Sequence, residues 1–302
     1  MKIRLLILIF LLGRVITTFS QSNIRINDYW DNFYYINPAS IHDQHKGEIS
    51  ITTRKQWVTF PGSPATFFAH ASVYFSNLNT QFGLKALGDK IGYTNIYNFD
   101  FSYAYHLLLN PIWNLNMALT LTYQGLNYDL SQINLANRDD PTVYEHLKFE
   151  SNFNSNLGLE LNNKNWKFGL ASQNIFSLFM HINGLFPNTN FLYANYRQYS
   201  DNFFNLGGGL CGIQYKNMFQ MEFNLNSYFK ITPQNNIFQV GLFYRTWYEM
   251  GLLLGIDVTS AFHLSYSYDF NVSNIRRNSI GTHELMLTYK FKEKPPCINC
   301  WY

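Results

Sequence analysis

The sequence predicts an all-β protein, a single antiparallel transmembrane β-barrel of about fourteen strands. Three observations support this prediction. Apolar and polar residues alternate along most of the 302 residues, the composition is aromatic and poor in charge, and an export signal precedes a chain without a long apolar helix. Inside a bilayer every backbone polar group needs a partner, and only helices and closed barrels provide one throughout.

The first twenty residues have the pattern of a secretory signal peptide. Lys2 and Arg4 precede the apolar run Leu5–Leu12, and the segment Thr17-Thr18-Phe19-Ser20 ends in a small residue before Gln21. This run is too short to cross a bilayer core, which needs about 20 apolar residues. We therefore expect export of the mature chain, and no later segment is apolar for long enough to form a transmembrane helix.

The composition argues against a cytosolic enzyme and against a nucleic-acid partner. Charged residues make up 14% and aromatic residues 18% of the chain, whereas a soluble domain has about 25% charged residues. The formal net charge is +3, and three basic residues, Lys2, Arg4 and Arg14, lie in the signal segment. The mature chain is therefore near neutral and lacks the positive surface that binds nucleic acid.

Strict alternation marks the strands. From Tyr97 to Leu107 the aromatic and aliphatic residues occupy every second position, and Trp113–Tyr123 repeats the pattern. Ten residues or more suit a tilted membrane strand of about 9–11 residues. The predicted strands are 47–58, 65–76, 81–88, 95–108, 112–126, 151–162, 164–175, 190–199, 203–216, 218–230, 236–246, 247–258, 261–271 and 281–292.

A soluble β-sandwich would show the same alternation, with its apolar side turned to a shared core. The barrel is favoured because aromatic residues gather at strand ends, as they do at the two membrane interfaces. The polar sides also carry Asn, Ser, Thr and Gln, with few Lys or Glu. Such side chains suit a crowded lumen better than bulk water.

Loop lengths give an independent topology prediction. The even-numbered connections are short and rich in turn formers, for example Asn110-Pro111, whereas the long segments Tyr128–Glu150 and Phe176–Thr189 both follow odd-numbered strands. Outer-membrane barrels have short periplasmic turns and longer external loops. An even strand count then predicts that both termini are periplasmic.

These patterns divide the chain into four parts. We expect a signal peptide over 1–20, an N-terminal periplasmic or plug segment over 21–46, the outer-membrane barrel over 47–292 and a periplasmic tail over 293–302. Phe68 and Tyr74 are expected to point inward and, with the plug segment, to obstruct the lumen. Inward Lys or Arg residues appear few (Lys85, Lys167 and Arg245), whereas a diffusion porin needs a charged constriction.

Chemistry-bearing motifs are sparse. His42 and His45 have a metal-like spacing but lie in a polar loop, and Cys297 and Cys300 form a C-x-x-C without a second ligand pair. A disulfide between those cysteines and an unpaired or partner-linked tail remain equal alternatives. Nothing resembles a nucleophile elbow, a metalloprotease helix or a nucleotide-binding loop, so we expect no enzyme activity, no metal and no cofactor.

The segment after the first strand carries two aromatic residues beside a bend rich in Pro and Gly. Trp57 and Phe60 precede Gly62 and Pro64. One interpretation is a rigid turn with an interfacial anchor. The other is a protein-docking point, because exposed aromatic side chains are frequent anchors of interfaces.

Several motifs, in order along the chain, resemble the PorP/SprF-like family of type IX secretion system outer-membrane proteins. The early element is Asn37-Pro38-Ala39, and the late pair is Tyr268-Asp269. Between and after them the matching residues are Arg54, Gln56, Trp57, Phe60, Gly62, Pro64, Asp89, Lys90, Gly92 and the strand Gly281–Leu287 with His283 and Glu284. The chain departs from the family pattern at Ser40-Ile41-His42 and at the final Cys300-Trp301-Tyr302.

The resemblance implies an outer-membrane protein that supports secretion or surface attachment of a partner, such as an adhesin used in gliding. We expect the external loops, chiefly Tyr128–Glu150 and Phe176–Thr189, to hold the C-terminal domain of a secreted protein. The other expected partners are further type IX components and outer-membrane lipid. A passive porin for small solutes is the alternative function. The resemblance also makes the motif residues candidates for partner docking.

Overall fold

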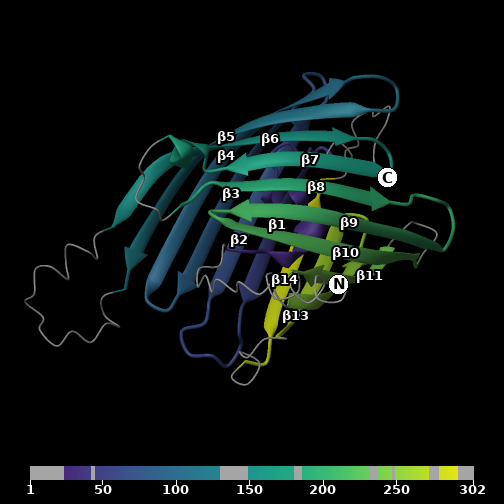
Figure 1. Cartoon of the computed structure of the whole chain (residues 1–302). Coiled ribbons are helices and arrows are strands. Elements are labelled where there is room, and N and C mark those ends of the chain that lie inside the picture. The colour runs from purple at the N-terminus through teal and green to yellow at the C-terminus, as the bar shows by residue number, and fades with distance from the viewer. Residues whose placement is uncertain are drawn as a thin grey trace, which may run out of the picture.

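The computed structural model is a closed barrel of fourteen antiparallel strands (Figure 1). It describes residues 24–41, 45–129, 149–179, 186–231, 237–246, 249–271 and 279–291. Each strand pairs with its neighbours in sequence, and β14 pairs with β1 to close the barrel. The predicted fold class and strand count are confirmed.

The strand bounds follow the alternating segments closely. They are β1 Gly47–Lys55, β2 Ala65–Phe75, β3 Thr80–Ile91, β4 Thr94–Leu108, β5 Asn114–Tyr128, β6 Glu150–Asn162, β7 Trp166–Gln173, β8 Thr189–Arg197, β9 Phe204–Tyr215, β10 Met218–Lys230, β11 Ile237–Arg245, β12 Glu249–Asp257, β13 Phe262–Asn271 and β14 Thr282–Lys290. We call the end with the β1–β2, β3–β4 and β13–β14 connections the loop end, and the opposite end the turn end. The two longest intervals between strands, 129–149 and 174–188, both lie at the loop end.

The side chains are arranged as in a membrane barrel. In β1 the buried residues Ser50 and Thr52 alternate with Ile49 and Ile51, which are 41% and 43% exposed on the outer wall. A sandwich would bury those isoleucines and expose the hydroxyl groups. The outer wall is therefore apolar and the lumen polar, as lipid on one side and a crowded interior on the other require.

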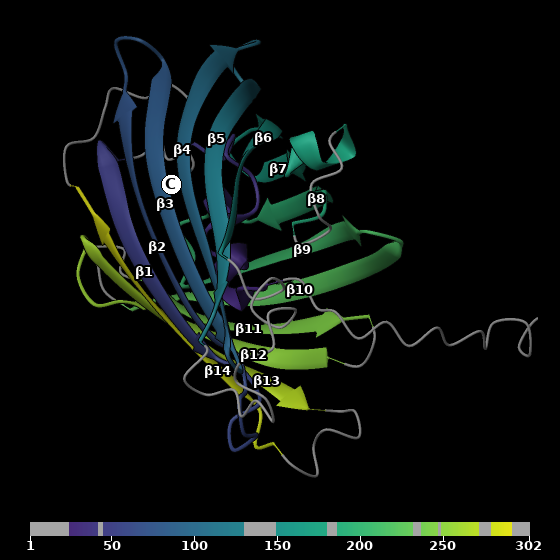
Figure 2. The ribbon, with the colours of Figure 1, turned by 90° about the vertical axis from the view of Figure 1, so that its left-hand side faces the viewer.

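The barrel wall is uneven in height. Strands β4 and β5 have 15 residues each, whereas β7 has 8, and Figure 2 shows β4 and β5 rising above β7 and β8 at the top of the view. One prediction needs correction here. Asp89 and Lys90 were expected in a loop, but β3 continues to Ile91 because these residues pair with Ile96 and Asn95 of β4.

An N-terminal segment, residues 24–41, lies inside the lumen. It contains two short 3-10 helices, η1 (Asn27–Trp30) and η2 (Phe33–Tyr35), which appear in purple inside the barrel in Figure 1. A third, η4 (Ile175–Leu178), follows β7. None of the helices in the described residues is long and apolar enough to cross a membrane.

Candidate functional site

Three connections at the loop end join into one structure, which we call the rim and define as residues 56–64, 92–93 and 279–281. The Val58 N–H donates to the carbonyl of Gly281 at 2.9 Å, and the Ile280 N–H donates back to Val58 at 3.1 Å. On the other side the Gly92 N–H donates to the Gly62 carbonyl at 2.9 Å. Motif residues more than 200 positions apart in the sequence therefore share one surface.

Unusual backbone conformations shape the rim. Trp57 and Thr59 have φ of 48° and 78°, and Gly62, Gly92 and Gly281 also have positive φ. A non-glycine residue with positive φ costs free energy and persists only where its surroundings determine the conformation. Here the surroundings include the hydrogen bond from the Trp57 N–H to Oγ1 of Thr282 at 3.3 Å.

The rim exposes apolar side chains. The rings of Trp57 and Phe60 meet edge to face, with centroids 6.5 Å apart. Phe60 is 41% exposed, and Tyr93 and Ile280 are also exposed. The rim thus presents aromatic and aliphatic groups on a hydrogen-bonded frame, the kind of surface that anchors protein contacts.

Some of the predicted motif residues build this frame. Gln56 accepts a hydrogen bond from Nη1 of Arg54 at 2.7 Å, and its N–H donates to the Pro64 carbonyl at 3.0 Å. Asp89, in β3, accepts from the Thr66 hydroxyl at 2.5 Å. Lys90, also in β3, forms a partly exposed ion pair with Asp129 at 3.7 Å.

Two other motif residues point into the lumen. The Arg54 guanidinium lies 3.3 Å from Oδ2 of Asp269 and 3.3 Å from Oε2 of Glu284. All three side chains are buried. The structure thus corrects the prediction for Arg54 and Glu284, which are candidate docking residues in the sequence but are shut away from the rim surface.

His283 lies on the opposite face of β14 from Glu284, on the outer wall. Its Nδ1 is hydrogen-bonded to the Tyr266 hydroxyl at 2.7 Å, and its ring is 5.0 Å from that of Tyr268. Polar aromatic groups near a strand end match the membrane interface. The two motif residues therefore point to opposite sides of the barrel wall, His283 to the outer surface and Glu284 to the lumen.

Glu284 binds the N-terminal segment directly. Its two carboxylate oxygens accept hydrogen bonds from the Asn27 N–H at 2.9 Å and the Asp28 N–H at 2.8 Å. The Asn27 side-chain amide donates to Asp269 at 2.6 Å. We call Asn27, Asp28, Arg54, Asp269 and Glu284 the lumenal network.

A second set of charges binds the same segment from β10–β12. Arg245 contacts Glu222 at 2.5 Å and Glu249 at 2.7 Å, and it donates to Asn27 at 3.0 Å. Arg25 of the segment pairs with Glu249 at 3.1 Å, while burial, followed by the charge of Arg245, lowers its pKa. Charge-assisted hydrogen bonds such as these are the strong ones.

Apolar packing completes the binding of the segment. The rings of Phe33 and Tyr193 stack at 4.5 Å, and Tyr35 meets Phe68 edge to face at 5.0 Å. Tyr74 belongs to a buried cluster with Ala39 and Ile41. Phe68 and Tyr74 are thus both inward-facing and packed against the segment.

The Asn37-Pro38-Ala39 motif has a clear structural role. The Asn37 amide donates to the Leu159 carbonyl and to the Tyr193 hydroxyl, each at 3.0 Å, while its oxygen accepts from the Ala39 N–H at 2.9 Å. A Cβ at Gly158 would lie 2.1 Å from that oxygen, so glycine is needed there. The motif joins the segment to β6 and β8.

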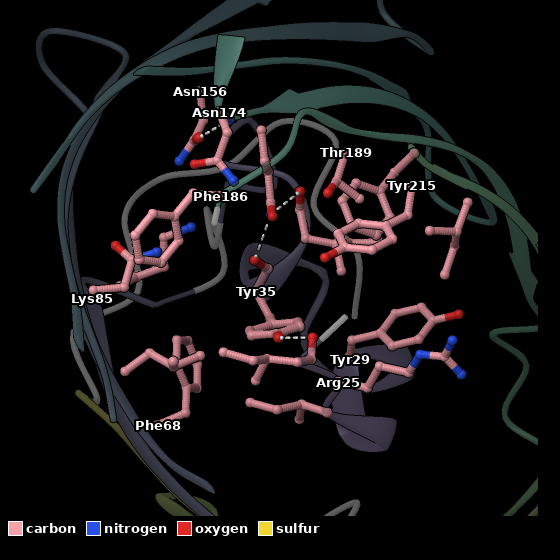
Figure 3. Close-up of a pocket in the computed structure, with 18 of the residues that line it drawn as sticks. Arg25, Tyr29, Tyr35, Phe68, Lys85, Asn156, Asn174, Phe186, Thr189 and Tyr215 are labelled. Carbon is pink, nitrogen blue, oxygen red and sulfur yellow. Dashed lines mark hydrogen bonds between the residues drawn. The ribbon is translucent and has the colours of Figure 1, made fainter. Parts of the chain in front are cut away.

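A cavity of about 150 Å³ remains between the segment and the barrel wall (Figure 3). Tyr29, Tyr35 and Phe68 give it an apolar side, and Lys85, Asn156 and Asn174 provide polar groups. In this region the Tyr35 hydroxyl donates to the Ile24 carbonyl at 3.0 Å.

Three of the remaining positions singled out in the sequence, His42, Cys297 and Cys300, lie outside the described residues. No group of three or more His, Cys, Asp or Glu in the described ranges is arranged to hold a metal ion.

Sequence reasoning identified Arg245 as an inward residue but missed Glu222 and the contacts of both residues with the segment. Glu222 and Arg245 occupy polar positions on strands of the correct register, so their inward orientation was predictable. Their partners Arg25 and Asn27 come from a segment without alternation. No local signal in the sequence connects the two groups.

Comparisons with known proteins agree with this architecture. A family model described as "Type IX secretion system membrane protein PorP/SprF" matches residues 18–289. No match is found among curated protein sequences.

Solved structures share the fold at low sequence identity. The toluene transporter TbuX of Ralstonia pickettii is 10% identical, with 87% of this chain and 93% of that chain covered and a TM-score of 0.50. The monoaromatic hydrocarbon channel CymD is 12% identical over 92% of this chain and 96% of that chain, with a TM-score of 0.47. Together with the family match, the barrel indicates an outer-membrane location. The chain belongs to the PorP/SprF family of type IX secretion system membrane proteins.

Proposed function

We propose that this barrel supports secretion or surface attachment of a partner protein, such as an adhesin, and that the rim is where the partner binds. The observation that carries the proposal is the convergence of three motif-bearing connections on one exposed apolar surface. Family membership implies other type IX secretion components as partners. The C-terminal domain of the secreted protein is the partner that we assign to the rim.

The occupied lumen supports a binding role over a diffusion role. Residues 24–41 fill the barrel interior and are held by ion pairs and by aromatic packing. An open porin needs a continuous aqueous path. The segment acts here as a plug, and the barrel presents its rim without conducting solutes.

The first test is a comparison of surface and secreted proteins in the native host. Replacing Trp57 and Phe60 together by alanine removes both aromatic groups of the β1–β2 connection from the rim. We expect loss of one large surface protein while the other outer-membrane proteins stay unchanged. The matched control is Phe203→Ala, which removes a 67% exposed phenylalanine from the turn end. Unchanged display in the double variant would refute rim docking.

The passive porin is the second candidate, because a cavity of about 150 Å³ adjoins the segment and TbuX is a toluene transporter. Its test is small-solute uptake in cells with and without the gene, together with conductance of the purified barrel in planar bilayers. Loss of uptake without any change in surface proteins would favour the porin. Closed channels and altered display would favour the docking function.

A further inference from the structure

Asp28 is a buried carboxyl group, and among the described residues no basic side chain forms an ion pair with it. It is 1% exposed, and its own N–H donates to Glu284. Neither of its carboxylate oxygens has a hydrogen-bond partner. An ionised carboxylate in such a site lacks both hydration and a basic partner, so the charged form is strongly disfavoured.

The basic residues around Asp28 are already paired with other acids. Arg54 pairs with Asp269 and Glu284, Arg245 pairs with Glu222 and Glu249, and Arg25 pairs with Glu249. The other acid of the segment, Asp31, accepts from the Gln239 amide at 2.8 Å. Carboxylates therefore outnumber basic side chains around Asp28, and each of these basic side chains pairs with an acid other than Asp28.

We propose that Asp28 is a proton-binding site, and that the proton which it takes up from solvent stabilises the docked N-terminal segment. In the protonated form the carboxyl loses its charge and gains one O–H donor. The hydroxyl of Ser265 faces it and has no hydrogen-bond partner of its own, so its oxygen can accept. No other bond forms or breaks in this step. The proposal is independent of the partner that binds the rim.

The direction of the pKa shift agrees with the geometry. Burial raises the pKa of Asp28 well above its ordinary value, and the charges of Glu284, Asp31 and Asp269 raise it further, while the Ser265 hydroxyl, which can donate to the ionised carboxylate, lowers it in part. In the released segment the carboxyl returns to the ordinary aspartate pKa of about 3.9. Because the docked state binds the proton more tightly, docking is strongest at low pH and weakens as the pH rises through the pKa of the docked state.

Hydrogen exchange followed by mass spectrometry tests this on the full mature chain in detergent micelles. The observable is the protection of the amides in residues 24–36, compared between the wild type and Asp28→Asn from pH 5 to pH 9. The ratio of the two opening constants cancels the intrinsic pH dependence of exchange. We expect the opening constant of the wild type, divided by that of Asp28→Asn, to rise at least tenfold from pH 5 to pH 9. A shifted pKa changes an equilibrium by up to tenfold per pH unit.

Asp31→Asn is the matched control. It removes the same charge three residues away, from a carboxylate that already has a donor in Gln239, and it should retain the pH dependence. A wild-type opening constant independent of pH would overturn the proposal whatever the variants do. Persistence of the pH dependence in Asp28→Asn would place the proton on another group and would also overturn it.

Discussion

The rim and the lumenal network lie on the same strands, yet they are held by different forces. The rim connects its loops through backbone hydrogen bonds, such as those between Val58 and Gly281. The lumenal network relies on buried side-chain charges, with Glu284 bound to two backbone N–H groups and close to Arg54. A backbone frame tolerates replacement of its exposed side chains, whereas a charge network does not tolerate loss of one member. The family motif thus combines an exposed surface on a backbone frame with an interior held by buried charges.

The largest expected effect comes from breaking the network. Glu284→Ala leaves Arg54 with one carboxylate and removes the acceptor of the Asn27 and Asp28 N–H groups. Breaking a buried ion pair costs about 3–5 kcal/mol, so we expect loss of amide protection in residues 24–36. Hydrogen exchange measures this. The control is Glu150→Ala, a half-exposed glutamate in β6, and equal protection in the two variants would contradict the role of Glu284.

A smaller effect is expected from the rim glycines, and it should differ between two of them. Gly281 has φ +132°, and an added Cβ would lie 2.6 Å from the Tyr268 hydroxyl and 2.8 Å from the Asp269 carbonyl. Gly62 has φ +71°, and its nearest contact would be an ordinary 3.5 Å. We expect Gly281→Ala to destabilise the barrel by about 2–3 kcal/mol and Gly62→Ala by about 1 kcal/mol.

Thermal unfolding in detergent distinguishes the two glycine variants. The midpoint for Gly281→Ala should fall further than that for Gly62→Ala. Equal midpoints would mean that the close approach at Gly281 relaxes without cost. In that case the rim would be more pliable than its hydrogen bonds indicate.

The smallest expected effect is at the partly exposed ion pair between Lys90 and Asp129, 3.7 Å apart. Such pairs contribute about 0–1 kcal/mol and are screened by salt. Lys90→Gln should lower stability by no more than this amount at low salt, and the difference should vanish at high salt. Denaturant titration at both salt concentrations measures it, and a persistent difference would show that Lys90 belongs with the buried charges.

The strands were predictable because alternation with a period of two is a local property of the sequence. The limits of β3 were less predictable, since Asp89 and Lys90 join the ladder through their pairing with both β2 and β4. Which inward groups meet across the lumen could not be predicted. The contact between Asn27 and Glu284 spans 257 positions, and alternation assigns a residue to a face but gives no partner on the far wall. The resemblance located the motif residues, but only the structure divides them between the rim and the lumen.

The pairing of β1 with β14 has a consequence for assembly. Arg54 stands opposite Glu284 in that pair, so the N-terminal segment binds across the junction of the first strand and the last. A chain that ends before Thr282 lacks Glu284 and leaves β1 without its closing partner. The hydrogen bonds from the Asn27 and Asp28 N–H groups to Glu284 can therefore form only once the last strand is in place, so this part of the docking is the final step in the order of synthesis.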